Sequence, residues 1–284
     1  MIESSELRWP NGARVAVAVE VMFETWSPGA APSYSVQATA LRPGVVDFGG
    51  HAWSSYGGRV GVWRILRALE RWGVPATFFV NAGSALTYRD AARRIVAAGH
   101  DVAGHGMYQD QLLAYQTPAE QRTTIEQCID ILDDVCGRRP TGWLSPALAF
   151  TPETAGLLAE AGLLWHADVT YIDLPHRVDT EHGPIAAVPH SDFTDNRVLK
   201  GRARDVFDVY KDTFDYLHEH EPMGLMPITL HCQFGGRPMM IAVFDELLSY
   251  LRRFDDVWFV QHAELGRLAL DSPGAELSYR DRFF

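Results

Sequence analysis

Cysteine, basic residues and long apolar runs are all scarce in this chain of 284 residues. Its three cysteines, Cys128, Cys136 and Cys232, form neither a disulfide framework nor a C-x-x-C pair, so a reducing cytoplasm is the expected location. No apolar run is long enough to cross a bilayer. The polar start at residues 1–15 lacks the basic end and apolar core of a signal peptide. The net charge of -11 argues against nucleic acid and anionic membranes as partners.

What the sequence does contain is a regular alternation of apolar runs and amphipathic segments. Strands are expected at 14–21, 75–80, 101–105, 141–146, 227–231 and 257–261, and helices at 60–73, 88–100, 117–137, 151–163 and 239–254. Alternating strands and helices predict parallel strands joined by right-handed crossovers. We therefore expect an α/β fold, an incomplete (β/α) barrel of about seven parallel strands, in a single domain over residues 1–284.

Two stretches interrupt this alternation. Residues 25–58 are rich in Gly, Pro, Ser and Ala, and a loop of that length is expected to be a lid, a binding loop or an oligomer contact. Residues 172–204 are mostly polar and contain the run PHSDFTDN. That run is a candidate to bring His190, Asp192 or Asn196 over a pocket.

Polar side chains follow four of the expected strands. Because parallel barrels build their sites at the carboxyl ends of strands, these residues are expected to share one rim. A pocket at that rim is the default candidate for a functional site. The residues are Glu20 with Glu24, His105 with Gln109, Ser145, and His231.

Three of these motifs resemble those of the polysaccharide deacetylase-type (NodB-homology) family, and the resemblance spans about residues 10 to 268. The runs VEVMFE, HGMYQ and TLHCQFGGRP stand where the family has Asp-x-Asp, His-x-x-x-His and a strand ending in Leu-His. The runs SYGGRVGVWRIL, DVTYIDLPH and LHCQFGGRP are most similar to a cytoplasmic branch that includes metal-independent allantoinases and cyclic imide hydrolases. The resemblance implies a deformed TIM barrel and a homotetramer.

The departures from the family motifs concern its metal site. The resemblance places Glu20 at the catalytic base, Met22 at the metal-binding Asp and Gln109 at the second metal-binding His, so that His105 alone remains of three ligands. Leu144 and Ser145 stand where the family has an Arg. A thioether and a carboxamide are poor ligands for a hard or borderline ion. We therefore expect no metal ion and no other cofactor.

A site without metal must activate water and assist the leaving group with side chains. We expect Glu20 to act as the base and His231 as the general acid, with Glu24 as partner, second base or substrate anchor. Donors without a metal suit an activated or strained carbonyl better than a simple acetamide. The expected reaction is hydrolysis of a carbon–nitrogen bond in a small cyclic amide or imide, such as an allantoin-, imide- or hydantoin-like ring.

Six residues are candidates for substrate binding. The His105 ring and the Gln109 carboxamide can donate hydrogen bonds to an oxyanion, and Ser145 lies at the same rim. Arg237 in the run GGRP either binds an anionic group of the substrate or closes a tight turn. The aromatic rings of Tyr56 and Trp26 either stack on a flat ring or belong to the core or a subunit contact.

Three other functions stay open at this stage. The same acid–base pocket can serve a metal-free lyase, isomerase or decarboxylase. A decayed enzyme that only binds a small ligand is another alternative. A metal-dependent small-molecule deacetylase with an unusual ligand set is the third.

Overall fold

The computed structural model describes residues 7–38, 41–42 and 44–272 of the chain. Residues 1–6 of the polar start and residues 273–284 of the expected domain lie outside the described residues. Its centre is a curled nine-stranded sheet in the order β6-β7-β5-β4-β3-β2-β1-β8, with β9 beside β1. The strands are β1 Val15–Phe23, β2 Ala76–Val80, β3 Asp101–Gly104, β4 Gly142–Trp143, β5 Trp165–His166, β6 His176–Thr180, β7 Gly183–Ala187, β8 Gly224–His231 and β9 Val257–Phe259.

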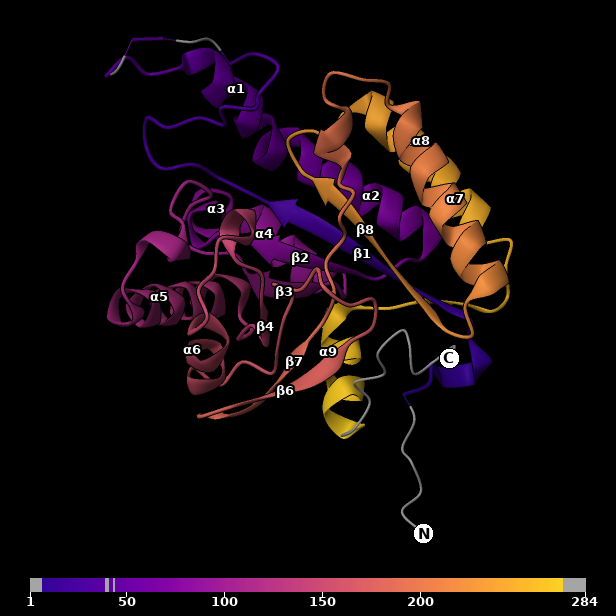
Figure 1. Ribbon diagram of the computed structural model, residues 1–284. Helices are drawn as coiled ribbons and strands as arrows, with labels where there is room; N and C mark the ends of the chain where they lie inside the picture. Colours follow the sequence, from indigo (N-terminus) through magenta and orange to yellow (C-terminus); the bar gives the residue numbers. More distant parts are fainter. Residues whose placement is uncertain (1–6, 39–40, 43, 273–284) are drawn as a thin grey trace.

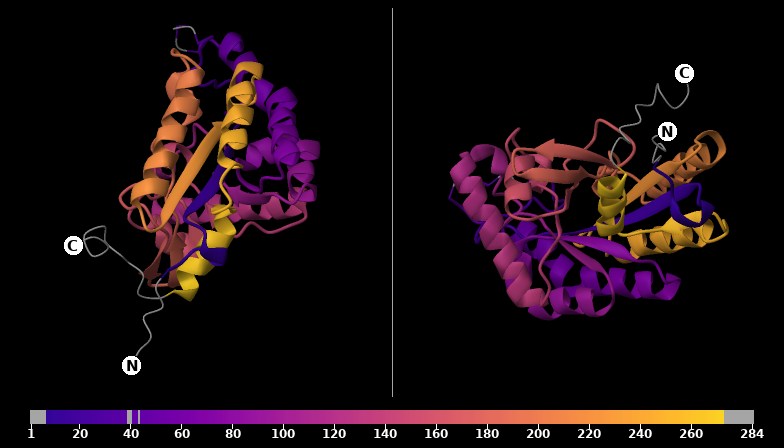
Figure 2. Two further views of the ribbon diagram at one scale, coloured as in Figure 1. Left: turned by 90° about the vertical axis from the view of Figure 1, so that its right-hand side faces the viewer. Right: turned by 90° about the horizontal axis from the view of Figure 1, so that it is seen from below.

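Most of the helices cover the outside of the curled sheet, whereas α9 packs against the side chains of the barrel interior (Figures 1 and 2). They are α1 Phe48–Tyr56, α2 Val62–Trp72, α3 Ala82–Thr87, α4 Arg89–Ala97, α5 Pro118–Cys136, α6 Thr154–Glu160, α7 Arg204–His220, α8 Pro238–Leu251 and α9 His262–Asp271. Short helical turns occur at η1 Pro10–Gly12, η2 Gly57–Gly61, η3 Leu113–Tyr115, η4 Pro146–Leu148 and η5 Asp195–Val198. Among the described helices, none is long and apolar enough to cross a membrane.

The predicted fold class, an incomplete α/β barrel, is confirmed. All strand pairs are parallel except β6 with β7, and the barrel stays open because β6 and β8 are the two edges of the sheet order. The expected count of about seven strands is too low because the polar region 172–204 contains the β6–β7 hairpin. In β6 only His176 is fully buried, so its residues lack the apolar pattern by which strands are recognised.

The sequence of β1 explains the position of the site. Val15, Val17 and Val19 belong to the apolar core that includes α2, α7 and α8, whereas Ala16 and Ala18 pack inside the barrel. Strand side chains alternate between faces, so Glu20, Met22 and Glu24 follow Ala18 on the inner side. The outer face is thus continuous apolar core, and the inner face turns polar toward its carboxyl end.

The composition predicted a single loop over residues 25–58, but the second half of this segment is helical. The Asp47 side chain accepts a hydrogen bond from the Gly50 backbone N–H and caps α1, which continues through η2 into α2. Gly49 and Gly50 at the start of α1 are poor helix formers, so the composition of this segment did not predict the helix. Figure 1 shows α1 beyond the arrowheads of β1 and β8, at the end of the barrel where the strands finish.

Candidate active site

A cavity of about 310 Å³ lies at the carboxyl ends of the strands. Five of the residues expected at the rim line it, namely Glu24, His105, Gln109, Ser145 and His231. Met22 forms part of the same wall, together with Tyr34 from the long N-terminal segment, His190 and Asn196 from the PHSDFTDN run, and the adjacent Arg197. The expected rim is therefore one continuous surface. Glu20, the expected base, does not line this cavity.

The Glu24 carboxylate lies between two histidines of the cavity wall. Its Oε1 atom is 3.7 Å from His105 Nε2 and 3.6 Å from His231 Nε2. Its Oε2 atom accepts hydrogen bonds from Gln233 Nε2 at 2.7 Å and from the Tyr34 hydroxyl at 3.3 Å. Burial alone would raise the pKa of Glu24, but His231, His105 and Gln233 lower it below its ordinary value. Glu24 is therefore an anion at neutral pH.

The His231 ring is fixed from behind by Asp195 of η5. Asp195 accepts hydrogen bonds from His231 Nδ1 at 2.5 Å and from the His231 backbone N–H at 2.8 Å. Burial alone would lower the pKa of His231, but the carboxylates of Glu24 and Asp195 raise it to about 9. At neutral pH His231 therefore carries a proton on Nε2, the ring atom nearest Glu24.

Glu20 is completely buried below the cavity, beside Thr229 in the β1–β8 pairing. Its carboxylate accepts a hydrogen bond from the Thr229 hydroxyl at 2.5 Å and is 2.9 Å from His262 Nε2. His190 Nδ1 lies 2.7 Å from Oε2, an ion-pair contact whose angle is not that of a linear hydrogen bond. Burial alone would raise the pKa of Glu20, but His190 and His262 hold it well below its ordinary value.

His262 reaches Glu20 because of where β9 ends. Strand β9 pairs with residues 15–17 of β1, on the same side on which β2 pairs with residues 19–23. The chain therefore leaves β9 next to the middle of β1, and His262 at the start of α9 points at Glu20.

Hydrogen bonds to the surrounding loops fix two further residues of the wall. His105 Nδ1 lies 2.7 Å from the Leu144 carbonyl oxygen and must donate to it, which leaves Nε2 free to face Glu24. The Ser145 hydroxyl and backbone N–H both donate to Asp168, each at 2.7 Å. Burial raises the pKa of Asp168 to about 6 despite these bonds.

Two buried acceptor atoms of the wall have no hydrogen-bond partner among the described residues, His105 Nε2 and Gln109 Oε1. Buried polar atoms are nearly always paired in native structures. A bound molecule that offers N–H or O–H groups would satisfy both of them.

The residues at the family's metal position do not fit a metal ion. The Met22 side chain is almost fully buried among apolar residues of the barrel interior, and Gln109 offers only a neutral carboxamide. Over residues 7–38, 41–42 and 44–272 no group of three His, Cys, Asp or Glu side chains is arranged to hold a metal ion. Met22 and Gln109 stand in place of the family's metal-binding Asp and second His, and this donor set is the observation against a metal centre.

Three of the expected substrate-binding residues lie outside the cavity. Arg237 donates to the backbone carbonyl oxygens of Gln233 and Trp53 and lies over the ring of Tyr56 at 4.3 Å. Tyr56 also accepts a hydrogen bond from Arg64. Trp26 is buried, and its ring contacts the edge of Tyr34, which does line the cavity. These positions favour a packing role for all three.

Residues of the site that were not expected from the sequence include Tyr34, Asp195, Arg197, Gln233 and His262. Asp195 lies in the polar run that had been singled out, but His190, Asp192 and Asn196 were the residues named there. Of those three, His190 and Asn196 line the cavity and Asp192 does not. The signal for His262 was its position just after the last expected strand, and for Gln233 its position two residues after His231.

Comparisons with known proteins show which family and fold the chain resembles. A sequence profile described as "Polysaccharide deacetylase" matches residues 45–165. The crystal structure of Puue allantoinase is 30% identical, with a TM-score of 0.82 over 92% of this chain and 91% of that chain. A probable polysaccharide deacetylase from Pseudomonas aeruginosa PAO1 is 28% identical, with a TM-score of 0.82 over 92% of both chains. The peptidoglycan deacetylase of Helicobacter pylori is 22% identical over 74% of this chain and 84% of that protein.

Proposed function

Because the chain belongs to the polysaccharide deacetylase family, whose members are hydrolases of carbon–nitrogen bonds other than peptide bonds, we propose that it opens a small cyclic amide or imide without a metal ion. One observation carries the proposal. The buried Glu24 anion and the protonated His231 lie 3.6 Å apart in the wall of a cavity in which Met22 and Gln109 stand at the family's metal-ligand positions. The similarity to an allantoinase, named for a cyclic ureide, points in the same direction.

His231 is the general acid in this proposal. Its Nε2–H is held toward the cavity by Asp195, and its pKa of about 9 keeps the proton available at neutral pH. When the carbon–nitrogen bond breaks, Nε2 gives this proton to the leaving nitrogen. Asp195 keeps the ring in place and stabilises its positive charge.

Glu24 is the substrate anchor in this proposal. A carboxylate that faces a cavity accepts a charge-assisted hydrogen bond from a ring N–H, and the Gln109 carboxamide can pair with an adjacent amide group of the same ring. Cyclic imides, hydantoins and ureides present N–H and C=O groups side by side. The cavity volume of about 310 Å³ is at the small end for ligand sites, which suits a single ring rather than a polymer.

The electrophile must be reactive in this proposal because no metal ion polarises its carbonyl oxygen. Each well-placed donor is worth roughly 3–4 kcal/mol in known enzymes. The donors that line the cavity are the Gln109 and Asn196 carboxamides and the Arg197 guanidinium. The pKa of the Tyr34 hydroxyl is raised by burial and by Glu24, so it keeps its proton and donates it to Glu24. An imide or hydantoin carbonyl is electron-poor and needs less help than the acetamide of an amino sugar.

The proposal is tested with a panel of succinimide, hydantoin, allantoin, 2-pyrrolidone and N-acetylglucosamine in heavy-oxygen water. We expect ring opening of at least one of the first three, with one heavy oxygen in the product carboxylate. Deacetylation of N-acetylglucosamine alone would contradict the proposed substrate class. Ring opening or isomerisation without label would instead indicate a lyase or isomerase.

Location and assembly belong to the proposal as well. A reducing cytoplasm fits three buried cysteines that are all unpaired. A homotetramer is proposed from the family resemblance and from exposed apolar side chains in the segment before and within α1, of which Val45 and Phe48 are the most exposed at 53% and 77%. Light scattering of the purified protein measures the subunit number directly.

A further inference from the structure

Two histidines of the cavity are each backed by a buried carboxylate. His231 is backed by Asp195 through a hydrogen bond, and His190 is backed by Glu20 through an ion-pair contact, with 2.7 Å between Nδ1 and Oε2. Both histidines line the cavity, whereas both carboxylates are fully buried. His231 is the general acid of the proposed reaction, and that reaction still lacks a role for His190 and Glu20.

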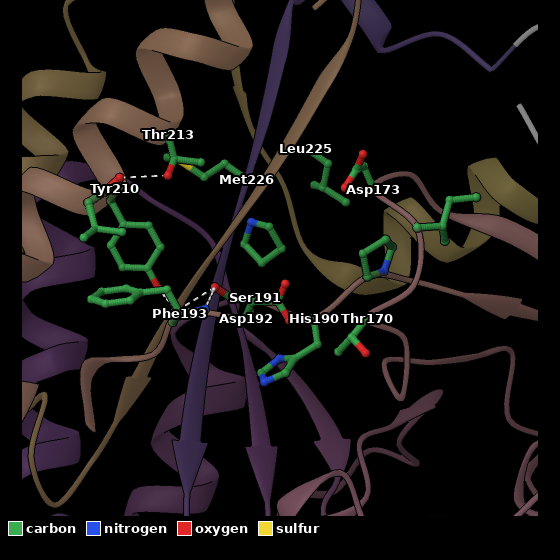
Figure 3. Close-up of a pocket in the computed structure, with 14 residues that line it drawn as sticks. Thr170, Asp173, His190, Ser191, Asp192, Phe193, Tyr210, Thr213, Leu225 and Met226 are labelled. Carbon is green, nitrogen blue, oxygen red and sulfur yellow. Dashed lines mark hydrogen bonds between the residues drawn. The ribbon is translucent and has the colours of Figure 1, made fainter. Parts of the chain in front are cut away.

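His190 is placed between two cavities. It lines the cavity of the candidate active site and also a neighbouring cavity of about 220 Å³, which lies between β8 and the chain that follows β7. Figure 3 shows the neighbouring cavity, with the His190 ring on the side toward which the arrowheads of the strands point. The ring therefore lies at the edge of the neighbouring cavity that is nearer the active-site end of the barrel.

The contacts of His190 define which ring atom is available. Nδ1 lies 2.7 Å from Glu20 Oε2 and has no other partner in the described part of the chain. A proton on Nδ1 is therefore stabilised by a carboxylate that can only accept, although the contact lacks the angle of a linear hydrogen bond. In the neutral ring, Nε2 then carries the lone pair, and no hydrogen bond ties this atom to another described residue. A carboxylate that fixes the tautomer of a histidine base is a recurrent arrangement in hydrolases.

We propose that His190 is the general base that activates the attacking water, and that Glu20 is the residue that positions it. This inference rests on the proposed function and names the missing base of that reaction. It also accounts for the buried Glu20: its carboxylate has three partners and no contact with the cavity, so it acts through His190.

The proposed hydrolysis uses one proton transfer to His190 and one from His231. His190 Nε2 takes one proton from water while the water oxygen bonds to the ring carbonyl carbon. The tetrahedral intermediate then breaks its carbon–nitrogen bond, and His231 Nε2 gives one proton to the leaving nitrogen. The product is a ring-opened acid, and solvent returns the proton from His190 to His231.

The first experiment compares His190→Gln with His262→Gln. Both histidines contact Glu20, but His262 is fully buried behind it and does not line the cavity. We expect kcat of His190→Gln to fall roughly 10²- to 10⁴-fold, the usual contribution of a general base, with little change in KM. His262→Gln is expected to lose far less, because the base is retained.

A rescue experiment separates a base from a neutralising charge. We expect added imidazole to restore part of the kcat of His190→Ala and none of the kcat of His262→Ala. Equal losses in both variants, with no rescue of either, would show that His190 only neutralises Glu20 and would overturn the inference. Thermal unfolding of each variant confirms that the compared proteins are folded.

The second experiment does not depend on the substrate. In wild-type protein with ¹⁵N-labelled histidine, the neutral His190 ring is expected to carry its proton on Nδ1. In Glu20→Gln the side-chain amide can donate to Nδ1, so the proton is expected to move to Nε2, and kcat should fall by roughly 10⁴-fold, as when the carboxylate of a catalytic triad is replaced by an amide. Glu20→Asp keeps the carboxylate and should retain the Nδ1–H tautomer.

The two experiments also separate the failure of the inference from failure of the proposed function. An Nε2–H tautomer in wild-type protein overturns the role of His190 whatever the substrate is. The expected tautomer together with no turnover of any cyclic amide or imide would instead contradict the proposed function. Proton transfer by His190 would then have no reaction to serve, and the inference would fall with it.

Discussion

Glu20 and Glu24 lie four positions apart, within and just after β1 on its inner side, yet their surroundings differ completely. Glu20 lies below the cavity floor, where Thr229, His190 and His262 occupy its oxygens. Glu24 lies in the cavity wall, and its Oε1 faces two histidines without a hydrogen bond to either. Both carboxyl groups have a lowered pKa, so charge does not distinguish them. Access to the cavity does distinguish them: Glu24 lines it and Glu20 does not. We therefore assign substrate contact to Glu24 and the positioning of His190 to Glu20.

Among substitutions in the cavity wall around Glu24, the largest effect is expected for His231→Asn. The variant loses the proton donor that faces Glu24, and kcat should fall roughly 10²- to 10⁴-fold, the usual range for a general acid. Asn keeps a polar side chain of similar reach, so the fold should survive. Steady-state kinetics on a cyclic imide measures the change, and an unchanged kcat would remove His231 from the reaction.

Glu24→Gln is the next change in size, and it should alter a different constant from Glu20→Gln. Removing the charge of a hydrogen-bonding anchor costs roughly 1.5–3 kcal/mol, which raises KM by about 10- to 150-fold while kcat changes less. Glu20→Gln should lower kcat with KM nearly unchanged. If both variants affected the same constant equally, the two glutamates would not have separate roles.

The sequence predicts much of this site because its residues follow strand ends in order along the chain. Glu24, His105, Gln109, Ser145 and His231 were all expected at one rim, and the structure brings them together there. The partition between Glu20 and Glu24 was not predictable, because burial depends on how far each residue lies from the end of β1. The expectation that Glu20 contacts the substrate as a base is therefore revised in our proposal.

The partners of the two key histidines were also beyond the sequence. Asp195 lies 36 positions before His231, and His190 lies 170 positions after Glu20, so neither contact has a local pattern. The strand count was too low for a similar reason, since the β6–β7 hairpin is polar and short. For Arg237 and Tyr56 the sequence left substrate contact and packing as alternatives, and the structure, in which their side chains pack against each other, favours packing.

The rate should depend on pH through His231, with a smaller effect than the substitutions above. Because the acid must carry its proton, kcat/KM should fall as the pH rises through about 9. Asp195→Asn removes one of the negative charges that raise this pKa, so the alkaline limb should move to lower pH. A limb that stays in place in Asp195→Asn would show that another group causes it.

The same raised pKa has a consequence for stability. The ordinary pKa of 6.5 applies to the unfolded chain, and the folded value is about 9. The proton therefore binds the folded state more tightly, and this stabilisation is complete below pH 6.5 and lost as the pH rises through about 9. Thermal melts across this range should show the loss in wild-type protein and a smaller one in Asp195→Asn.

A further variant restores the metal ligands that this chain lacks. In Met22→Asp with Gln109→His, the two new side chains join His105 in a set of one carboxylate and two imidazoles. An unpaired Asp in the buried Met22 position should destabilise the metal-free protein, and zinc at 100 times its Kd should add about 2.7 kcal/mol to the stability of the folded state. Thermal melts with and without zinc measure this, with wild type as the control that should not respond.

The smallest effect is expected for Arg237→Ala. The guanidinium bonds backbone oxygens and covers aromatic rings outside the cavity, so its loss should cost stability, about 1 kcal/mol for the hydrogen bonds, and leave KM within roughly threefold of wild type. Thermal melts and steady-state kinetics separate the two effects. A large rise in KM, limited to substrates with an acidic group, would return Arg237 to the binding site.

The central claim is that the cavity hydrolyses its substrate with histidines and carboxylates and no metal ion. The most direct test measures kcat on the active ring substrate after exhaustive chelation, with residual metal quantified, and again after addition of zinc or cobalt. The account predicts equal kcat values in all three states at less than one metal ion per hundred subunits. Activity that is lost on chelation and regained with zinc or cobalt would contradict it.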